Sequence, residues 1–247
     1  RRYVFDLEGP RFKNTWFSEP IYNGRYPEDG LRHFGDAVPA IKPTDMDTIA
    51  QPLDYFAVNL YSSETIRAPH TPGDSDPAVA SGEQTAQGTN LFTQQTSLTT
   101  QTFETVPKPP GFPKSAMGWP ITPEILYWWP KFFYEAYELP VVITENGISN
   151  SDWVHTDGQV HDVQRVDFLT RYLREYGRAY QDGIDVRGYF AWSLMDNFEW
   201  NLGYDPRFGL IYVDYETQQR ILKDSAEWYR QIIETNGRIL VGRLSLT

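Results

Sequence analysis

The sequence contains no cysteine, few basic residues and no long apolar run. Without cysteine, it can form no disulfide bond, no thiolate metal site and no cysteine nucleophile. Lysine and arginine number 22 against 33 aspartates and glutamates, a formal charge of −11, so we expect no binding of nucleic acid through its phosphates. No apolar stretch approaches the roughly 20 residues of a membrane span, and we expect no membrane partner.

The chain begins Arg1-Arg2-Tyr3, without an initiator methionine or a signal peptide. Because it starts in the middle of a pattern, this beginning is consistent with a natural N-terminus farther upstream. In the absence of a targeting signal, we favour a cytoplasmic location.

Aromatic residues are abundant. The 8 Trp, 16 Tyr and 14 Phe make up 15% of the chain. These rings can fill a large core, to which the 40% of hydrophobic residues would contribute. They can also form a carbohydrate site, where ring faces stack on the apolar faces of sugars and acidic groups hold the hydroxyls. Composition alone leaves both interpretations open.

Short apolar runs alternate with helical patterns. Strands are predicted at 55–60, 141–144 and 187–192. Helices are predicted at 123–138, 163–181 and 224–236. The strands lack polar alternation, which is typical of parallel strands buried on both faces. We expect Pro130 to kink or break the first helix, Asp162 to cap the second and Gly183 to end it. Strands alternating with helices indicate βα units and a parallel sheet.

Residues 62–118 interrupt this alternation. They are rich in Ser, Thr, Gln, Pro and Gly, and a loop of this length is usually functional or mobile. The β-branched residues at Leu91–Phe103 favour a short hairpin within it. We expect one domain over 1–247, because neither a repeat nor a second domain is evident.

A glutamate and a tyrosine follow two of the predicted strands. Glu145, in VVITENG, stands at the carboxyl end of a buried strand, where a parallel barrel builds its active site. Asn59 and Tyr61 alternate at another strand end, so both side chains point to one face, and a tyrosine hydroxyl can orient a carboxylate. The alternatives are a glutamate bonded to neighbouring backbone and a tyrosine that fills the core.

The segment Gly188–Gly209, GYFAWSLMDNFEWNLGYDPRFG, follows the third strand. Glu199 lies between Trp192, which ends the strand, and Trp200. A carboxylate beside indole rings suits a sugar, because it accepts hydrogen bonds from two hydroxyls while a ring stacks on the sugar face. The alternative is a buried aromatic loop with a structural ion pair.

In this order, the segments resemble the C-terminal part of family 1 glycoside hydrolases, the β-glucosidase family. ITENG resembles the nucleophile motif of that family, and VNLYSS resembles its sixth-strand motif, usually NYY or NHY. WSLMDNFEW followed by GYDPRFGLIYVDY resembles its eighth-strand sugar-binding signature. MGWPITPE and the early DLEGPRFKNTWFSEPIYNGRYP also fit.

The resemblance implies roles for seven residues. Glu145 would be the nucleophile and Tyr61 its hydrogen-bond partner. The sugar contacts would be Asn59 lining the pocket, Trp192 beneath the ring, Glu199 on two hydroxyls, Trp200 on the outer hydroxyls and Phe208 as a wall. A carboxylate at Glu199 would repel phosphate, which favours an unphosphorylated sugar.

The resemblance also implies an α/β fold, a (β/α)8 TIM barrel of which this chain supplies about the last three βα units and the helix before them. The N-terminal half, with the Asn-Glu-Pro acid/base motif, is absent from the sequence. Ser18-Glu19-Pro20 has Ser where Asn is needed, so Glu19 is not expected to be the acid. The missing half is expected as a separate chain or as an upstream segment.

The activity so implied is that of a retaining β-glycosidase acting on a β-linked glucoside or oligosaccharide. It would proceed by double displacement through a glycosyl-enzyme on Glu145, with the acid/base glutamate outside this chain. We expect neither a cofactor nor a metal, because carboxylates suffice for this chemistry. The alternatives are a sugar-binding remnant or inactive fragment without turnover, and a phospho-β-glycosidase.

Overall fold

The computed structural model describes residues 15–67 and 104–241. The chain divides into two compact units, one formed by residues 1–63 with 113–247 and the other by residues 64–112. The smaller unit falls within the loop predicted at 62–118, and the larger unit carries every predicted site residue. The hairpin predicted at Leu91–Phe103 lies outside the described residues.

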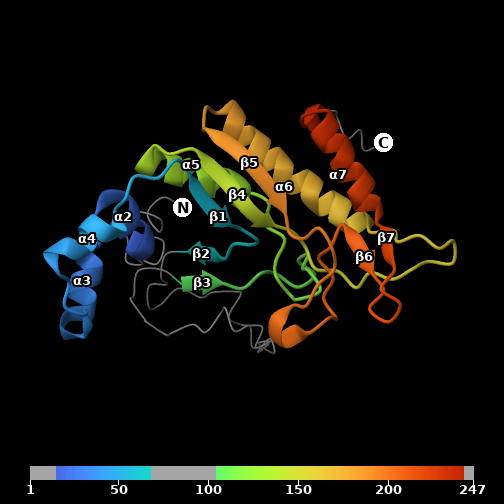
Figure 1. Ribbon diagram of the computed structural model, residues 1–247, viewed down its shortest axis with the longest axis horizontal. Helices are drawn as coiled ribbons and strands as arrows, with labels where there is room; N and C mark the ends of the chain where they lie inside the picture. The colour runs from blue at the N-terminus through green and yellow to red at the C-terminus, as the bar shows by residue number, and fades with distance from the viewer. Residues whose placement is uncertain (1–14, 68–103, 242–247) are drawn as a thin grey trace, which may run out of the picture. The chain divides into compact units, whose positions relative to one another are not determined.

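Three strands form the sheet of the larger unit. They are β1 (Phe56–Asn59), β4 (Val141–Asn146) and β5 (Val186–Ala191). Their order is β1-β4-β5, and both pairings are parallel (Figure 1). The three strands and their parallel arrangement are therefore confirmed. The expected burial on both faces is wrong for β1 and β5, in which Ala57, Asn59, Arg187 and Phe190 are exposed. In the described part of the chain, β1 and β5 each pair with a strand on one edge only.

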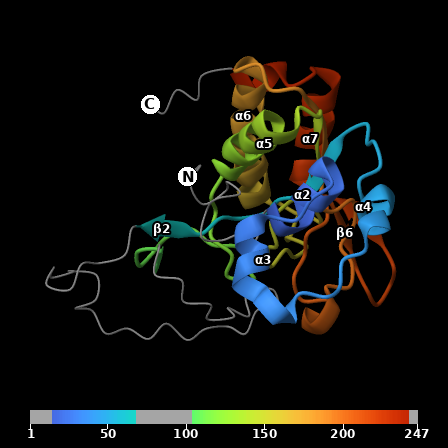
Figure 2. The same cartoon turned by 90° about the vertical axis from the view of Figure 1, so that its left-hand side faces the viewer.

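Helices cover one face of this sheet. They are α5 (Ile125–Tyr137), α6 (Val163–Gln181) and α7 (Asp224–Glu234). Figure 2 shows them side by side. The buried core between α5, α6 and β4 includes Leu126, Val141, Ile143, Leu169 and Tyr172. This core packs against the face of the strands that the helices cover. The carboxyl ends of the strands remain free to carry polar side chains.

Helix α5 continues through Pro130, so the helix does not break there, and the predicted alternative of a kink stays a prediction. Proline removes the amide hydrogen that would bond to the carbonyl of Leu126. Packing on both sides of Pro130 offsets this loss. Phe133, after the proline, is 2% exposed, and its ring centroid lies 3.9 Å from that of Phe56 on β1.

The ends of α6 differ in how far they follow prediction. Asp162 occupies the N-cap position but makes no capping hydrogen bond. Its carboxylate instead accepts hydrogen bonds from Arg165 and from the amide of Ser225 at 2.8 Å. At the other end, Gly183 adopts φ +86°, and the amide of Ile184 bonds to the carbonyl of Ala179 at 3.1 Å. The predicted termination at glycine is confirmed.

The remaining elements are short. In the larger unit they are α2 (Thr15–Asn23), α3 (Glu28–Phe34), η1 (Gly35–Ala37), α4 (Pro43–Ile49), η3 (Trp200–Leu202), β6 (Ile211–Val213), β7 (Arg220–Leu222) and η4 (Arg238–Val241). Strands β6 and β7 form an antiparallel pair. In the smaller unit, β2 (Thr65–Arg67) pairs antiparallel with β3 (Glu104–Val106). Among the described residues, no helix combines the length and the apolar character needed to cross a membrane.

Large apolar side chains are exposed on β5 and on the loop that follows it. The exposed fraction is 61% for Phe190, 64% for Leu194, 55% for Phe198 and 75% for Trp200. Single exposed apolar residues are common, but four so close in the sequence are characteristic of a surface that another chain or segment covers.

His161 joins the loop before α6 to the start of α7. Its Nδ1 lies 2.8 Å from Asp224 Oδ2, and its Nε2 lies 2.9 Å from Asp157 Oδ2. The hydrogen bond to Asp157, followed by that to Asp224, raises the pKa of His161, and the same bond to His161 lowers the pKa of Asp157. The pair is therefore most stabilising when the imidazole is charged and Asp157 is ionised.

We expect the stability difference between the wild type and His161→Asn to depend on pH. The histidine contributes fully below its unfolded-state pKa of about 6.5, and its contribution is lost as the pH rises through the raised folded-state value. It also declines in acid, as the pH falls through the lowered pKa of Asp157. Thermal unfolding should show a larger gap between the two proteins near pH 6 than near pH 9. An equal gap at both would contradict this assignment.

Candidate active site

A glutamate and a tyrosine meet at the carboxyl ends of adjacent parallel strands. Glu145 lies near the end of β4, and Tyr61 lies just beyond β1. The Tyr61 hydroxyl donates a hydrogen bond of 2.6 Å to Glu145 Oε2. Burial, and then this hydrogen bond, raises the pKa of Tyr61 well above its ordinary value. The phenol therefore stays protonated and serves as a donor to the carboxylate throughout the working pH range.

A register shift determines which way Glu145 faces. Val58 of β1 pairs with Ile143 of β4. The next residue, Asn59, pairs with Glu145, so Thr144 is left over as a bulge. Without the shift, strand alternation would place Glu145 on the buried face that Ile143 occupies. With it, Glu145 shares the face of Asn59, whose side chain is exposed.

Buried hydrogen bonds hold the backbone around Glu145 and Tyr61 in place. Asn146 is fully buried; its Nδ2 donates to the Leu60 carbonyl at 2.7 Å, and its Oδ1 accepts from the Tyr189 hydroxyl at 2.7 Å. One side chain thus joins β4 to the chain beyond β1 and to β5. The Tyr172 hydroxyl, from α6, donates to the Tyr61 carbonyl at 2.9 Å. Both members of the pair are therefore fixed by their backbones.

Asn59 lies beside the pair, and its side chain is hydrogen-bonded to Thr144. Its Oδ1 accepts a hydrogen bond of 2.7 Å from the Thr144 hydroxyl. The amide of Asn59 remains exposed on the same face as the glutamate. It can therefore offer both a donor and an acceptor to a ligand there.

Trp192 and Glu199 bring a second carboxylate to the site. The Trp192 Nε1, at the end of β5, donates to Glu199 Oε1 at 3.4 Å. Glu199 is 9% exposed, and burial raises its pKa; the bond from Trp192 opposes this shift, and the charge of Glu145 adds to it. The charge of Glu145 therefore acts on Glu199. Trp200, next in the chain, is 75% exposed.

Phe208 belongs to a ring cluster around Tyr61. Phe208 is 2% exposed, and its ring centroid lies 6.3 Å from that of Tyr61. Trp119 completes the cluster, at 5.3 Å from Tyr61 and 6.2 Å from Phe208. Trp119 is not among the predicted site residues, although it lies within the MGWPITPE segment, which could have pointed to it.

Close backbone contact just beyond the ends of β4 and β5 explains the glycine two residues after Glu145. A β-carbon at Gly147 would lie 1.8 Å from the Trp192 carbonyl oxygen. The peptide bond between Trp192 and Ser193 is cis. The close approach of Gly147 to the Trp192 carbonyl brings the loop that carries Glu199 against the strand end that carries Glu145.

Two other acidic residues, Asp196 and Glu19, do not join these two glutamates. Asp196 is turned inward, where its carboxylate pairs with Arg207 and Lys223 at 2.7 Å each. The predicted alternative of a structural ion pair in this loop therefore applies to Asp196. Glu19, in α2, accepts from Asn23 at 2.9 Å and lies 3.5 Å from Arg25. The expectation that Glu19 is not the acid stays a prediction.

The structure thus gathers five predicted residues and one unpredicted residue around Glu145. They are Asn59, Tyr61, Trp119, Trp192, Glu199 and Phe208. Carboxylates among aromatic rings are typical of sites that bind carbohydrate. The roles assigned to these residues from sequence stay predictions.

Comparison with known proteins identifies the family. The profile of glycosyl hydrolase family 1 matches residues 8–238. This chain therefore belongs to glycosyl hydrolase family 1. The family expected from the sequence motifs is confirmed.

Relatives of known name agree with this assignment. The 1,4-beta-D-glucan glucohydrolase of Thermotoga neapolitana is 38% identical over 238 residues, which cover 94% of this chain and 47% of that protein. The bifunctional beta-D-glucosidase/beta-D-fucosidase of Bifidobacterium breve is 39% identical over 231 residues, which cover 89% of this chain and 46% of the relative. The chain spans about half the length of the relatives it matches.

Solved structures are similar over the same extent. The beta-glucosidase from Thermotoga maritima, in complex with glucoimidazole, superposes with a TM-score of 0.73 at 36% identity, covering 96% of this chain and 46% of that structure. The predicted fold class, part of an α/β TIM barrel, is confirmed by this likeness and by the parallel sheet.

Proposed function

We propose that this chain supplies the nucleophile half of a retaining β-glycosidase that acts on β-linked glucosides or oligosaccharides. The observation that carries the proposal is the 2.6 Å hydrogen bond from Tyr61 to Glu145 in a chain of glycosyl hydrolase family 1. A carboxylate held rigidly at strand ends, facing away from the core, is suited to attack a bound sugar.

In the first step, a Glu145 oxygen bonds to the anomeric carbon while the bond from that carbon to the leaving oxygen breaks. An acid outside this chain gives its proton to the leaving oxygen. In the second step, water attacks the anomeric carbon, the ester to Glu145 breaks, and the same outside group takes the proton of the water. Two inversions give net retention. Tyr61 orients Glu145 before the attack.

The residues around Glu145 would bind the sugar. Trp192 lies beneath the ring, Glu199 accepts hydrogen bonds from two hydroxyls, and Trp200 contacts the outer hydroxyls. Phe208 forms a wall and Asn59 lines the pocket. The names of the relatives, glucosidases and a glucan glucohydrolase, support a β-glucoside as substrate.

The remaining part of the barrel is the partner that this mechanism requires. Retaining enzymes hold their two carboxyl groups about 5–5.5 Å apart, so the acid must come close to Glu145. A separate chain or an upstream segment of the same protein would supply it, together with further sugar contacts. We call this chain with its completing half the assembled enzyme.

Native mass, measured alongside denatured mass, tests the assembly. A complex with a second polypeptide about the size of the missing half, or a longer single chain, should hydrolyse 4-nitrophenyl β-D-glucoside. NMR of the first product should show the β anomer. Release of the α anomer would exclude the retaining mechanism, and a complete assembly that binds the glucoside without cleaving it would mean a sugar-binding remnant.

The same assay separates plain from phosphorylated substrates. The Glu199 carboxylate lies where the proposal places sugar hydroxyls, and negative charge there repels phosphate. The plain glucoside should therefore be the better substrate. A preference for the 6-phosphorylated glucoside would overturn this reading and assign a phospho-β-glycosidase.

Tyr61→Phe should lower kcat/KM of the assembled enzyme by about 10- to 10²-fold, the range for a hydrogen bond to a charged group. The ring is retained, so its contacts with Trp119 and Phe208 persist, and thermal stability should change little. Tyr180→Phe is the matched control, because Tyr180 is 68% exposed at the far end of α6. Equal kinetics for wild type and Tyr61→Phe would remove Tyr61 from the proposal.

A further inference from the structure

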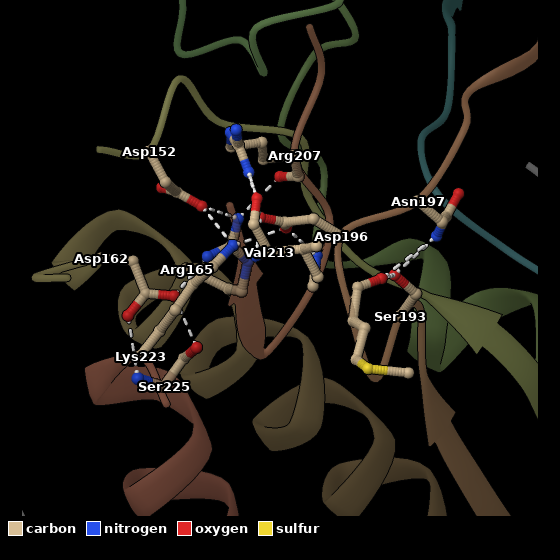
Figure 3. A network of polar contacts seen from close by, with 12 residues as sticks. Asp152, Asp162, Arg165, Ser193, Asp196, Asn197, Arg207, Val213, Lys223 and Ser225 are labelled. Carbon is tan, nitrogen blue, oxygen red and sulfur yellow. Dashed lines mark hydrogen bonds and ion pairs between the residues drawn. The ribbon is translucent and has the colours of Figure 1, made fainter. Parts of the chain in front are cut away.

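Six charged side chains form a buried charge cluster beside the candidate site (Figure 3). Its members are Asp152, Asp162, Arg165, Asp196, Arg207 and Lys223. Arg207 is 14% exposed, and the other five side chains are at most 5% exposed. Three negative and three positive charges balance. Such clusters add little net stability compared with apolar packing, which favours a role in holding a specific geometry.

Lys223 joins the two halves of the cluster. Its Nζ lies 2.6 Å from Asp152 Oδ2 and 2.7 Å from Asp196 Oδ1, and its side chain is fully buried. Strand β4 carries Glu145, and Asp152 lies in the loop that follows this strand. Asp196 lies in the loop after β5, which carries Glu199. One ammonium group therefore ties the loop that follows Glu145 and β4 to the loop that bears Glu199.

Asp196 holds both ends of its own loop. Its carboxylate accepts hydrogen bonds from the amides of Gly209 at 2.9 Å and Val213 at 3.3 Å, and it pairs with Arg207 at 2.7 Å. The segment between, residues 197–206, includes Glu199 and Trp200. Fixing Asp196 thus closes the base of the loop and sets where those two side chains lie.

Arg165 anchors the other half. It pairs with Asp152 at 2.7 Å and donates to the Arg207 carbonyl at 2.7 Å. The backbones of Asn150 and Arg207 also bond to each other, at 3.0 and 3.1 Å. The loop after β4 and the loop after β5 are therefore linked through Lys223, through Arg165 and through these backbone bonds. We call this set of links the clamp.

We propose that Lys223 is a positioning residue of this enzyme: through Asp152 and Asp196 it sets the place of Glu199 and Trp200 relative to Glu145. Lys223 does not touch the sugar. The proposal of a positioning role in catalysis rests on the function proposed above, whereas the effect on the loop itself does not.

Amide hydrogen exchange tests the effect on the loop without any activity. In Lys223→Met, the carboxylates of Asp152 and Asp196 each keep one arginine partner, so folding should survive. Exchange at the Gly209 and Val213 amides should quicken by about tenfold or more, while the amide of Ile143 in β4 should be unchanged. Uniform quickening, or none at 209 and 213, would overturn the proposal.

Kinetics of the assembled enzyme test the link to Glu199. Lys223→Met should lower kcat/KM for 4-nitrophenyl β-D-glucoside by on the order of 10- to 10²-fold, since misplacement by about 1 Å costs that much. In a Glu199→Gln background, Lys223→Met should change kcat/KM by less than about twofold. The side chain that Lys223 positions, that of residue 199, is already impaired in this background. Equal losses in both backgrounds would mean a merely structural lysine.

Two further variants keep these outcomes separable. Lys131→Met makes the same change at the ion pair of α5 with Glu135, and it should leave exchange and kinetics as in the wild type. If Lys223→Met fails to fold, the charge-balanced variant Lys223→Met with Asp152→Asn takes its place, with the same expectations. If Lys223→Met alters exchange at 209 and 213 as expected but the assembled wild type lacks glucosidase activity, the effect on the loop is supported and the proposed function is refuted.

Discussion

Replacing Glu145 by glutamine is expected to lower kcat of the assembled enzyme on 4-nitrophenyl β-D-glucoside by at least about 10⁴-fold. The amide has the size of the carboxylate and still accepts the hydrogen bond from Tyr61, so the fold should persist. It is too weak a nucleophile to form the glycosyl-enzyme. Steady-state kinetics with enzyme of unchanged thermal midpoint measure this effect.

Two controls make that result specific to the nucleophile. Glu216→Gln makes the same change in the exposed turn between β6 and β7 and should retain full activity. Glu145→Gly leaves space for azide, which should form a bond to the anomeric carbon from the vacated side as nitrophenolate leaves, giving the α-glucosyl azide. Wild-type turnover by Glu145→Gln would refute the assignment.

Gly147→Ala is expected to destabilise the protein by at least about 3 kcal/mol, or to prevent folding. A β-carbon there would lie 1.8 Å from the oxygen and 2.9 Å from the carbon of the Trp192 carbonyl. Both atoms are backbone, so β4 or β5 must move. Chemical denaturation, followed by tryptophan fluorescence, compares the two proteins.

Gly177→Ala is the matched control for this substitution. Gly177 lies within α6, and a β-carbon added there would meet no atom within 4 Å. Alanine is the better helix former, so this variant should gain about 0.5–1 kcal/mol. The two substitutions are chemically identical, and opposite signs would locate the effect in the contact with Trp192. Equal effects would contradict it.

The elements that sequence predicted well depend on local patterns. The 163–181 helix matches α6 because its periodicity and its terminal glycine are properties of that segment alone. The capping role expected of Asp162 fails because Ser225, 63 residues away, takes its carboxylate instead. Partners distant in the sequence decide how a polar side chain is used, and periodicity carries no information about them.

The same distinction applies to the site. Glu145 could be placed at a strand end from its sequence, since an apolar run precedes it. The bulge at Thr144, which turns Glu145 away from the core, depends on pairing with β1 and has no local signature. Lys223 likewise looks like an ordinary surface lysine between Leu222 and Asp224. Only the arrival of Asp152 and Asp196 makes it a buried residue.

The exposed apolar side chains of β5 and its loop have a consequence for the life of this protein in a cell. Phe190 and Leu194 are more than half exposed, and so is Trp200, which the proposed mechanism uses. In a barrel built from two polypeptides, an orphan half displays this surface to chaperones, proteases and other copies of itself. Pairing hides the surface and completes the sugar site in a single event. If the completing half is a separate chain, quality control that removes unpaired halves would also remove inactive ones, and the cellular abundance of this chain would follow that of the completing half.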